Sequence, residues 1–448
     1  MNNHILQIAE GIKKNRRALW SWHLEYLKRS SPPFYCSVDL RDSGHKIVPV
    51  DSNLFPAGFN NICPEDRRTA PSLFRAQIEA IFSQKTDSIA SKLLIISESH
   101  TQNSYYIENL YYLNQILENA GYETRIGWYG PLPEGADSHV VLKSATDKEL
   151  IAYPIEIHEG VLSAQGFVPD LILLNNDFSS GYPDLLDSVE QPIVPSHTLG
   201  WHTRKKSDHF KYYNQLAKEF AQIIGIDPWM IQIETEEVSP VNFNEDLGVD
   251  QVKATVNRVL LKTKQNYLQH QITREPFVFV KNNSGTYGMG IMVAHSADDL
   301  NHINRRIRNK MSVGKNRLPI QSVVVQEGIP TATIIDRLAA EPVIYLVGSQ
   351  LMGGFLRTNT EKGAEENLNS QGMVFKKLCM SDLRASQLDS ASEDEQEGEE
   401  EPILELVYGS VARLSALATG LELAHQMLPE KDQFIPSKTS DPSQASRV

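Results

Sequence analysis

The sequence predicts an α/β chain, and two observations support this fold class. Between residues 91 and 200, apolar runs typical of buried strands alternate with a helical segment, which indicates a mostly parallel open sheet. Further along, residues 276–295 (PFVFVKNNSGTYGMGIMVAH) read as a strand, a lysine, a glycine loop and a second strand. At 448 residues, the chain is long enough for two or three such domains.

Composition narrows the class of protein. The formal net charge is −13, from 43 Lys+Arg against 56 Asp+Glu, which argues against non-specific binding to nucleic acid. No apolar run approaches the length of a membrane span, and the first residues lack the apolar core of a signal peptide. Three cysteines without a zinc spacing suit a reducing compartment. We expect a cytoplasmic protein with small-molecule substrates, no nucleic-acid or membrane partner, and an oligomeric state left open.

The first 61 residues predict a helix over 5–29 and then a hairpin with strands at 35–41 and 46–51. Because side chains alternate along a strand, the hairpin presents four polar residues in two same-face pairs: Asp39, Arg41, Asp51 and Asn53. This pattern fits a metal–anion site and fits equally well a set of edge residues exposed to water. The next loop, LFPAGFNN, carries Asn60 and Asn61.

Strands are predicted at 92–97, 124–128, 171–174 and 192–195, with a helix over 107–119. Ligands of open α/β sheets bind beyond the carboxyl ends of the strands. Glu98, His100 and Asn103 follow such an end, although a capping or turn role explains each of them equally well.

Residues 200–270 read as mostly helical and begin with a basic cluster, Arg204 to Lys206, with Lys211 just beyond. A basic helix start can meet phosphate, although a solvated face is the commoner outcome. After the glycine loop come a strand at 323–327 and a hairpin of strands 343–347 and 351–357, which ends in Arg357. The polar loop that follows carries Asn359 and Asn367.

The glycine loop itself fits neither of two common phosphate motifs. The chain has no GxxxxGK[ST], and its glycines read GxxGxG before a strand, whereas the dinucleotide fingerprint reads GxGxxG before a helix. A glycine hairpin with a lysine before it fits a flexible cover whose backbone N–H groups hold the phosphates of ATP. The residues of this predicted cover are Lys281, Ser284, Gly285, Gly288 and Gly290.

Together with VVVQEGI and EPVIYLVGSQLMGGFLR, this element resembles the ATP-grasp fold, and most closely that of bacterial glutathione synthetases. The resemblance implies that Gln326 and Glu327 hold adenine and ribose and that Arg357 contacts the transferred phosphate. The family places a carboxylate-x-Asn motif for Mg²⁺ after this arginine, and the chain has none there.

The hairpin near the N-terminus carries the missing pattern, Asp51-x-Asn53. We therefore expect a circular permutation in which the N-terminal helix and hairpin complete the C-terminal subdomain. Asp39 is the expected third magnesium ligand, although the matching family position falls alternatively on Arg41.

Taken whole, the chain resembles the proteobacterial, ATP-grasp-like type of glutamate–cysteine ligase. The resemblance is carried by SVDLRDSGHKIVPVDSNLFPAGFNN, LLIISESHTQNSYYIENLYYL, FVFVKNNSGTYGMGIMV and LMGGFLRTN. It implies ATP- and Mg²⁺-dependent formation of γ-glutamylcysteine from L-glutamate and L-cysteine through a γ-glutamyl phosphate. The alternatives are another ATP-grasp ligase, such as a glutathione synthetase, and a silent ATP-binding sensor.

The resemblance also implies roles for single residues. Lys281 and Arg357 are the expected catalytic residues, and Lys211 is expected to bind the nucleotide with the glycine loop, Gln326 and Glu327. The residues expected to hold the amino acids are Arg41, Asn60, Asn61, Glu98, His100, Asn103, Asn359 and Asn367.

The predicted domains divide the chain into five parts. Residues 1–90 form the helix and metal-site hairpin, 91–200 a Rossmann-like substrate domain, and 201–322 the subdomain with the glycine loop. Residues 323–430 form the core subdomain, with a disordered acidic loop over 382–401, and 431–448 are a flexible tail.

Overall fold

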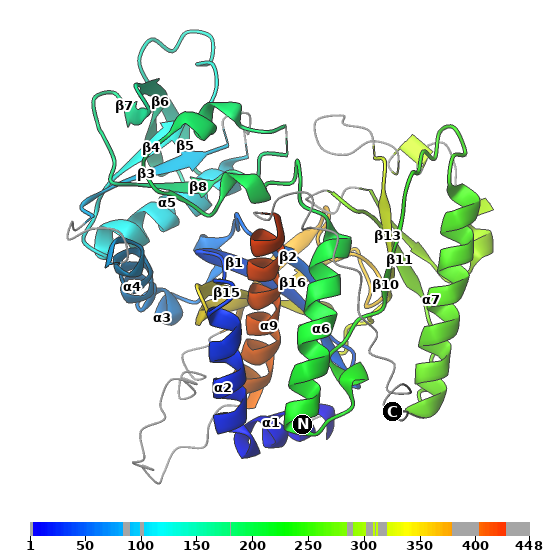
Figure 1. Cartoon of the computed structure of the whole chain (residues 1–448). Coiled ribbons are helices and arrows are strands. Elements are labelled where there is room, and N and C mark those ends of the chain that lie inside the picture. The colour runs from blue at the N-terminus through cyan, green and yellow to red at the C-terminus, as the bar shows by residue number, and fades with distance from the viewer. Residues whose placement is uncertain are drawn as a thin grey trace, which may run out of the picture.

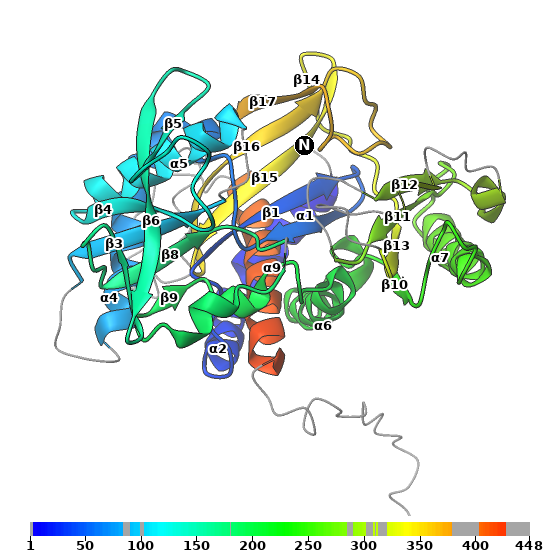
Figure 2. The same ribbon diagram turned by 90° about the horizontal axis from the view of Figure 1, so that it is seen from above.

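Three β-sheets organise the protein. The computed structural model describes residues 3–83, 90–98, 103–179, 181–284, 290–301, 308–309, 311, 320–378 and 403–426. Within these residues, the strands form sheets of six, four and seven strands, which we call the central, glycine-loop and mixed sheets. The central sheet lies between the other two, as Figures 1 and 2 show.

The central sheet is antiparallel, and its strands come from residues 35–53 and from residues 334–378. Its order is β17-β16-β15-β1-β2, with β14 beside β15. The strands are β1 (Tyr35–Asp42), β2 (Ile47–Asn53), β14 (Ile334–Ile335), β15 (Leu338–Val347), β16 (Gln350–Asn359) and β17 (Met373–Leu378). The predicted N-terminal hairpin is therefore part of the sheet that carries Arg357, with Asp39 opposite Val343 of β15. That this order reflects a circular permutation stays a prediction.

The glycine-loop sheet is also antiparallel, in the order β10-β13-β11-β12. Its strands are β10 (Thr235–Val238), β11 (Val278–Asn282), β12 (Ile291–Ala294) and β13 (Val323–Glu327). Helix α7 (Val249–Gln269) packs on it through a valine-rich cluster. The two strands predicted on either side of the glycine loop are confirmed, since β11 and β12 pair in register from Val278 with Ala294 to Lys281 with Ile291.

The mixed sheet is mostly parallel where the sequence predicted it to be. The β3/β4, β3/β8, β4/β6 and β8/β9 pairs are parallel, whereas β5 and β7 pair with β6 antiparallel. The strands are β3 (Lys92–Ser97), β4 (Glu123–Trp128), β5 (Val140–Lys143), β6 (Glu149–His158), β7 (Val161–Ala164), β8 (Leu171–Asn175) and β9 (Ile193–Val194). Sequence reasoning missed β5 to β7, because these half-exposed strands lack a continuous apolar run.

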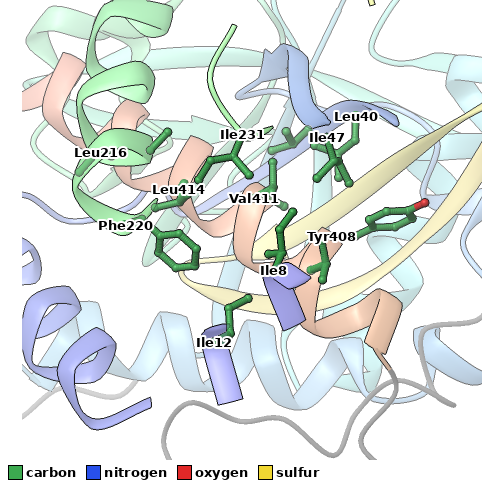
Figure 3. Close-up of a cluster of buried hydrophobic side chains, with 14 of the residues drawn as sticks. Ile8, Ile12, Leu40, Ile47, Leu216, Phe220, Ile231, Tyr408, Val411 and Leu414 are labelled. Atoms are coloured by element: carbon green, nitrogen blue, oxygen red, sulfur yellow. The ribbon is translucent and has the colours of Figure 1, made fainter. Parts of the chain in front are cut away.

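Helices cover both faces of the central sheet. The main core lies between one face and helices α1 (Asn3–Lys14), α2 (Arg16–Leu27), α6 (Lys206–Ile224) and α9 (Ile403–Gln426). Figure 3 shows Ile8 of α1, Leu216 of α6 and Val411 of α9 meeting Leu40 and Ile47 of the hairpin. The other face packs against α4 (Ala70–Ser83) and α5 (Ser104–Asn119), with the short α3 (Pro64–Arg67) nearby.

The predicted single helix over 5–29 is two helices. The break falls at Asn15, whose side-chain amide donates to the carbonyl oxygen of Gly11 at 2.9 Å. Asparagine competes with helical hydrogen bonding in this way, which explains the break. No helix among the described residues is long and apolar enough to cross a membrane.

Several predictions fall outside the described residues. They concern His100, Gly285 and Gly288, the acidic loop over 382–401 and the tail over 431–448. The division of the chain into five parts also stays a prediction.

Candidate active site

A cleft lies where the central sheet, the glycine-loop sheet and the start of α6 meet. Its lining combines three carboxylates, three cations and three amides with apolar walls. The lining residues are Asp39, Arg41, Val50, Asp51, Lys206, Phe279, Lys281, Asn282, Ile291, Glu341, Asn367 and Asn369.

Two carboxylates, Asp39 and Asp51, come from the N-terminal hairpin. They stand directly opposite each other in the register of β1 and β2, next to a bulge at Val50. Burial raises the pKa of the Asp39 carboxyl, against the lowering effect of Arg357. Burial acts on Asp51 in the same direction, but Lys206 outweighs it and holds the pKa of that carboxyl below its usual range. The hairpin thus presents two adjacent acids, one with a raised pKa and one with a lowered pKa.

Behind Asp39 lies a chain of buried opposite charges. Arg357 donates to Asp39 at 2.6 Å and to Glu341 at 2.9 Å, and its register partner on β15 is Glu341 itself. Glu341 also accepts from Arg41 Nε at 2.9 Å. Burial would raise the pKa of Glu341, but Arg41 and Arg357 lower it. The two guanidinium groups are therefore held rigidly by a shared carboxylate.

Arg41 does not reach freely into the cleft, as a residue that binds an amino acid would. Its other two nitrogens donate to the carbonyl oxygens of Ile329 at 2.9 Å and Glu366 at 2.5 Å. In the described structure, Arg41 therefore fixes the loop over 360–372. Asn359, predicted to bind substrate, has the same effect: its fully buried amide donates to carbonyls of this loop at Leu368 and Gln371.

Within the described part of the chain, the hydrogen-bond acceptors of Lys281, at the end of β11, are neutral. Its ammonium group donates to Gln326 Oε1 at 2.6 Å and to the carbonyl oxygen of Val50 at 3.1 Å. Burial lowers its pKa to about 7, even though Asp51 nearby favours the charged form. An anion in the cleft would supply the full counter-charge that Lys281 lacks.

The start of α6 joins the two sheets. Lys206 contacts Asp51 at 2.5 Å, while its backbone N–H donates to the carbonyl oxygen of Asn283 at 2.8 Å. Two residues earlier, Arg204 donates to the carbonyl oxygen of Ser52 and forms a buried pair with Glu422 of α9. This segment therefore connects the acidic hairpin to the strand that leads into the glycine loop.

The end of β13 carries the two residues expected to hold adenine and ribose. Glu327 is buried and pairs with Lys46 at 2.9 Å, and Gln326 accepts from Lys281. Among the described residues, Gln326 Nε2 and Glu327 Oε1 are buried without a hydrogen-bond partner. Such atoms are costly to leave unsatisfied, so a polar ligand at this point would stabilise them.

The oxygen donors of the hairpin decide whether it could hold a divalent metal. No group of three or more His, Cys, Asp or Glu side chains in the described part of the chain is arranged to hold a metal ion. Magnesium, however, is commonly held by one or two carboxylates together with phosphate oxygens. Asp39 and Asp51 occupy opposite register positions and both line the cleft, so their carboxylates fit that requirement, whereas Asn53 at the end of β2 does not line the cleft.

The cleft brings together five of the predicted site residues: Asp39, Arg41, Asp51, Lys281 and Asn367. Arg357 lies directly behind them, in contact with Asp39. Lys211 lies elsewhere: it is exposed on α6, five positions after Lys206, which takes the place in the cleft. Ser284 is exposed, and Gly290 has a φ of +63°, a left-handed conformation that favours glycine.

The remaining predicted substrate residues do not line the cleft. Asn103 caps α5 by accepting from the N–H of Tyr105, which was the alternative explanation from the sequence. Asn60 and Asn61 bond to each other in a short 3₁₀ turn, and Glu98 is buried after β3. The cap contact of Asn103 and the turn contact between Asn60 and Asn61 explain why these polar residues stand there.

The sequence did not predict Glu341, Asn282 or Asn369 as site residues, and it marked Lys206 only as part of a basic cluster. The basic cluster at 204–206 was the available signal for Lys206. Glu341 was overlooked because β15 begins at Leu338, in a stretch whose Ala, Glu and Pro residues disfavour strands.

Comparison with known proteins shows the family of the chain. The family model for glutamate–cysteine ligase matches residues 10–423. A crystal structure from Methylobacillus flagellatus KT, of a protein provisionally described as a gamma-glutamylcysteine synthetase, has 37% sequence identity and a TM-score of 0.82. That match covers 95% of this chain and 97% of the other. No curated protein matches the chain.

A second solved structure, D-alanyl-alanine synthetase A from Vibrio cholerae O1 biovar eltor, has 13% identity and a TM-score of 0.32. It covers 74% of this chain and 82% of the other, and this likeness is too low to support an argument.

The family match and the high TM-score confirm the predicted mixed α/β, ATP-grasp-like fold class. Members of such a family use ATP and a divalent metal on small-molecule substrates, and a silent sensor is not favoured. The chain belongs to the glutamate–cysteine ligase family and is an ATP-dependent ligase.

Proposed function

We propose that the cleft between the central and glycine-loop sheets joins the γ-carboxylate of L-glutamate to the amine of L-cysteine at the expense of ATP. The observation that supports this site most directly is the gathering of Asp39, Asp51, Lys281 and Arg357 from four different strands. Asp39 and Arg357 are 318 positions apart in the sequence, and their contact depends on the whole central sheet.

In this proposal the nucleotide lies along the glycine-loop sheet. The unpartnered polar atoms of Gln326 and Glu327 receive the adenosine part, and Lys281 receives the phosphates. The glycine loop excludes water from the phosphates, so that a reactive intermediate is not hydrolysed.

Magnesium is the proposed divalent metal, held by Asp51 and Asp39 with Asn53 close by on β2. When bound, magnesium neutralises phosphate charge and orients the γ-phosphoryl group. Arg357 completes this side of the cleft with a guanidinium group that is already oriented by Asp39 and Glu341.

The reaction has two balanced steps. A γ-carboxylate oxygen of glutamate attacks the γ-phosphorus of ATP, the bond to the β-phosphate oxygen breaks, and γ-glutamyl phosphate and ADP form. The neutral amine of cysteine then attacks the acyl carbon, phosphate leaves, and the amide loses a proton. The side chains position the reactants and neutralise charge, and no covalent enzyme intermediate is required.

ADP release tests this proposal when the purified protein is supplied with ATP, Mg²⁺ and amino acids, singly and in pairs. We expect sustained ADP and γ-glutamylcysteine formation only with glutamate and cysteine together. Turnover with γ-glutamylcysteine and glycine would instead identify a glutathione synthetase. ATP binding without turnover on any pair would contradict a ligase function.

A further inference from the structure

Both carboxylates proposed for the divalent metal are already paired with cations of the protein. Asp39 is paired with Arg357 at 2.6 Å, and Asp51 with Lys206 at 2.5 Å. The lining of the cleft as a whole holds three carboxylates against three cations. A divalent cation that arrives alone would therefore find no uncompensated negative charge in this lining.

The two pairs differ in how firmly the cation is held. Arg357 bonds to two buried carboxylates, Asp39 and Glu341. If Arg357 moved away, both carboxylates would stay buried without their counter-charge, at a large cost in free energy. Among the described residues, the ammonium group of Lys206 forms an ion pair with Asp51 alone. The Asp51 side chain is 25% exposed, and that of Lys206 is 8% exposed. Of these two cations, Lys206 is therefore the one whose release costs less free energy.

The surroundings of Lys206 allow its ammonium group to move while its backbone stays fixed. Its backbone N–H is anchored on the carbonyl oxygen of Asn283, at the entrance to the glycine loop. Its ammonium group lies 4.3 Å from the ring centre of Trp201, which provides a second, weaker cation site. A lysine has a flexible four-carbon stem, so its charge can be redirected without a change in the fold.

We propose that Lys206 occupies the place of the divalent cation on Asp51 in the free protein, and transfers to the nucleotide phosphates when metal and nucleotide bind together. This inference rests on the proposed function in one respect, the assignment of Asp51 to the metal. Lys206 is thus a positioning residue that makes metal binding depend on nucleotide binding, because the phosphates must accept the charge that Asp51 gives up. By linkage, the metal strengthens nucleotide binding by the same factor.

The test measures Mn²⁺ binding to the full chain without nucleotide, from the electron paramagnetic resonance signal of free Mn²⁺. We expect weak binding in the wild-type protein. Lys206→Met removes the competing charge and keeps the length of the stem, so it should bind Mn²⁺ about 10- to 100-fold more tightly, the effect of one charge-assisted contact. Lys206→Arg restores a competing cation and should again bind weakly.

Two further variants locate the effect. Lys205→Met removes the adjacent, exposed lysine and should leave Mn²⁺ affinity unchanged. Asp51→Asn combined with Lys206→Met should abolish the gain, since the released carboxylate is then absent. Thermal unfolding of each variant shows whether it is folded.

An unchanged Mn²⁺ affinity in folded Lys206→Met would overturn the inference. So would a gain that persists in the double variant, because the metal would then bind elsewhere. The measurement uses no amino acid, so it is independent of the ligase assay. A chain that fails to join glutamate and cysteine but shows the gain would contradict the proposed function only.

Discussion

The two sides of the cleft hold their cations in opposite ways. On the central sheet, Arg357 is paired with two buried carboxylates, which raise the pKa of its guanidinium group. On the glycine-loop sheet, the acceptors that Lys281 finds among the described residues are neutral, and burial lowers its pKa to about 7. The cation of the central sheet is ion-paired before a ligand arrives, whereas Lys281 makes no direct ion pair with a described residue and is only near Asp51.

This difference suggests a division of labour between the sheets. A guanidinium group fixed by carboxylates on its far side can stabilise developing charge without reorganising during the reaction. A poorly compensated ammonium group gains most when a phosphate binds, so its contribution appears as nucleotide affinity. The central sheet would thus serve the chemical step, and the glycine-loop sheet would serve ATP binding.

The largest expected effect comes from Arg357→Ala. Turnover should fall by about two to three decades, the effect of about 3–4 kcal/mol of lost transition-state stabilisation, while ATP still binds. The variant should also unfold more easily, by about 3–5 kcal/mol, because Asp39 and Glu341 remain buried without their partner. Steady-state kinetics, equilibrium ATP binding and denaturant unfolding measure the three quantities.

The control for Arg357 is Arg258→Ala, which removes an arginine from an exposed pair with Glu236. It should change turnover little and stability by less than about 1 kcal/mol. Normal turnover in Arg357→Ala would contradict the assignment of the chemical step to the central sheet.

Lys281→Met should have the next largest effect, and on the other side of the comparison. ATP affinity should fall about 10- to 100-fold, as expected for one charge-assisted contact. Lys262→Met is the matched control, because Lys262 forms an exposed pair with Glu234 on the outside of the same region. Equal ATP affinity in wild type and Lys281→Met would remove the proposed role of the glycine-loop sheet.

The pH dependence of ATP binding sharpens this prediction. In the protein without a ligand, the pKa of Lys281 is about 7, and bound phosphate raises it. The stabilisation of bound ATP by the charge of Lys281 is therefore fully present below pH 7. That contribution is lost as pH rises through the pKa of the bound state. Calorimetry at about pH 8, in buffers of different ionisation enthalpy, should detect proton uptake in the wild type and less uptake in Lys281→Met.

The smallest effect is expected from deleting residues 386–400. This stretch contains most of the acidic run SEDEQEGEEE, which contributes strongly to the net charge of the protein. If only the paired carboxylates of the cleft matter for the reaction, kcat and KM should stay within about twofold, because the sequence predicts that such a run of like charges is solvated and therefore screened by salt. A folded deletion variant without activity would show that the carboxylates of this run serve the reaction as well.

Local patterns predicted much of the fold. The hairpin at 35–53 and the strands on both sides of the glycine loop are present as expected. Short-range physics determines such elements: side-chain periodicity, glycine in turns and continuous apolar runs. Where these signals are weak, as in the half-exposed strands β5 to β7, the elements were missed.

The candidate site was only partly predictable, and Lys206 and Lys211 show why. Both belong to the same basic stretch, and the sequence favoured Lys211. Five positions along a helix turn a side chain well away from its starting direction, so only one of the two can face β2. Packing of α6 against α9 and the hairpin selects Lys206.

By itself, the sequence determined which chemical groups are available: a lysine before a glycine loop, an Asp-x-Asn on a hairpin, and an arginine at a strand end. The tertiary structure alone decided which of them meet. Pairing of β1 with β15 places Asp39 against Arg357, and the register of β15 with β16 inserts Glu341 between two arginines. The physical reason is that charge pairing depends on distance through a folded sheet, and separation along the chain carries no information about it.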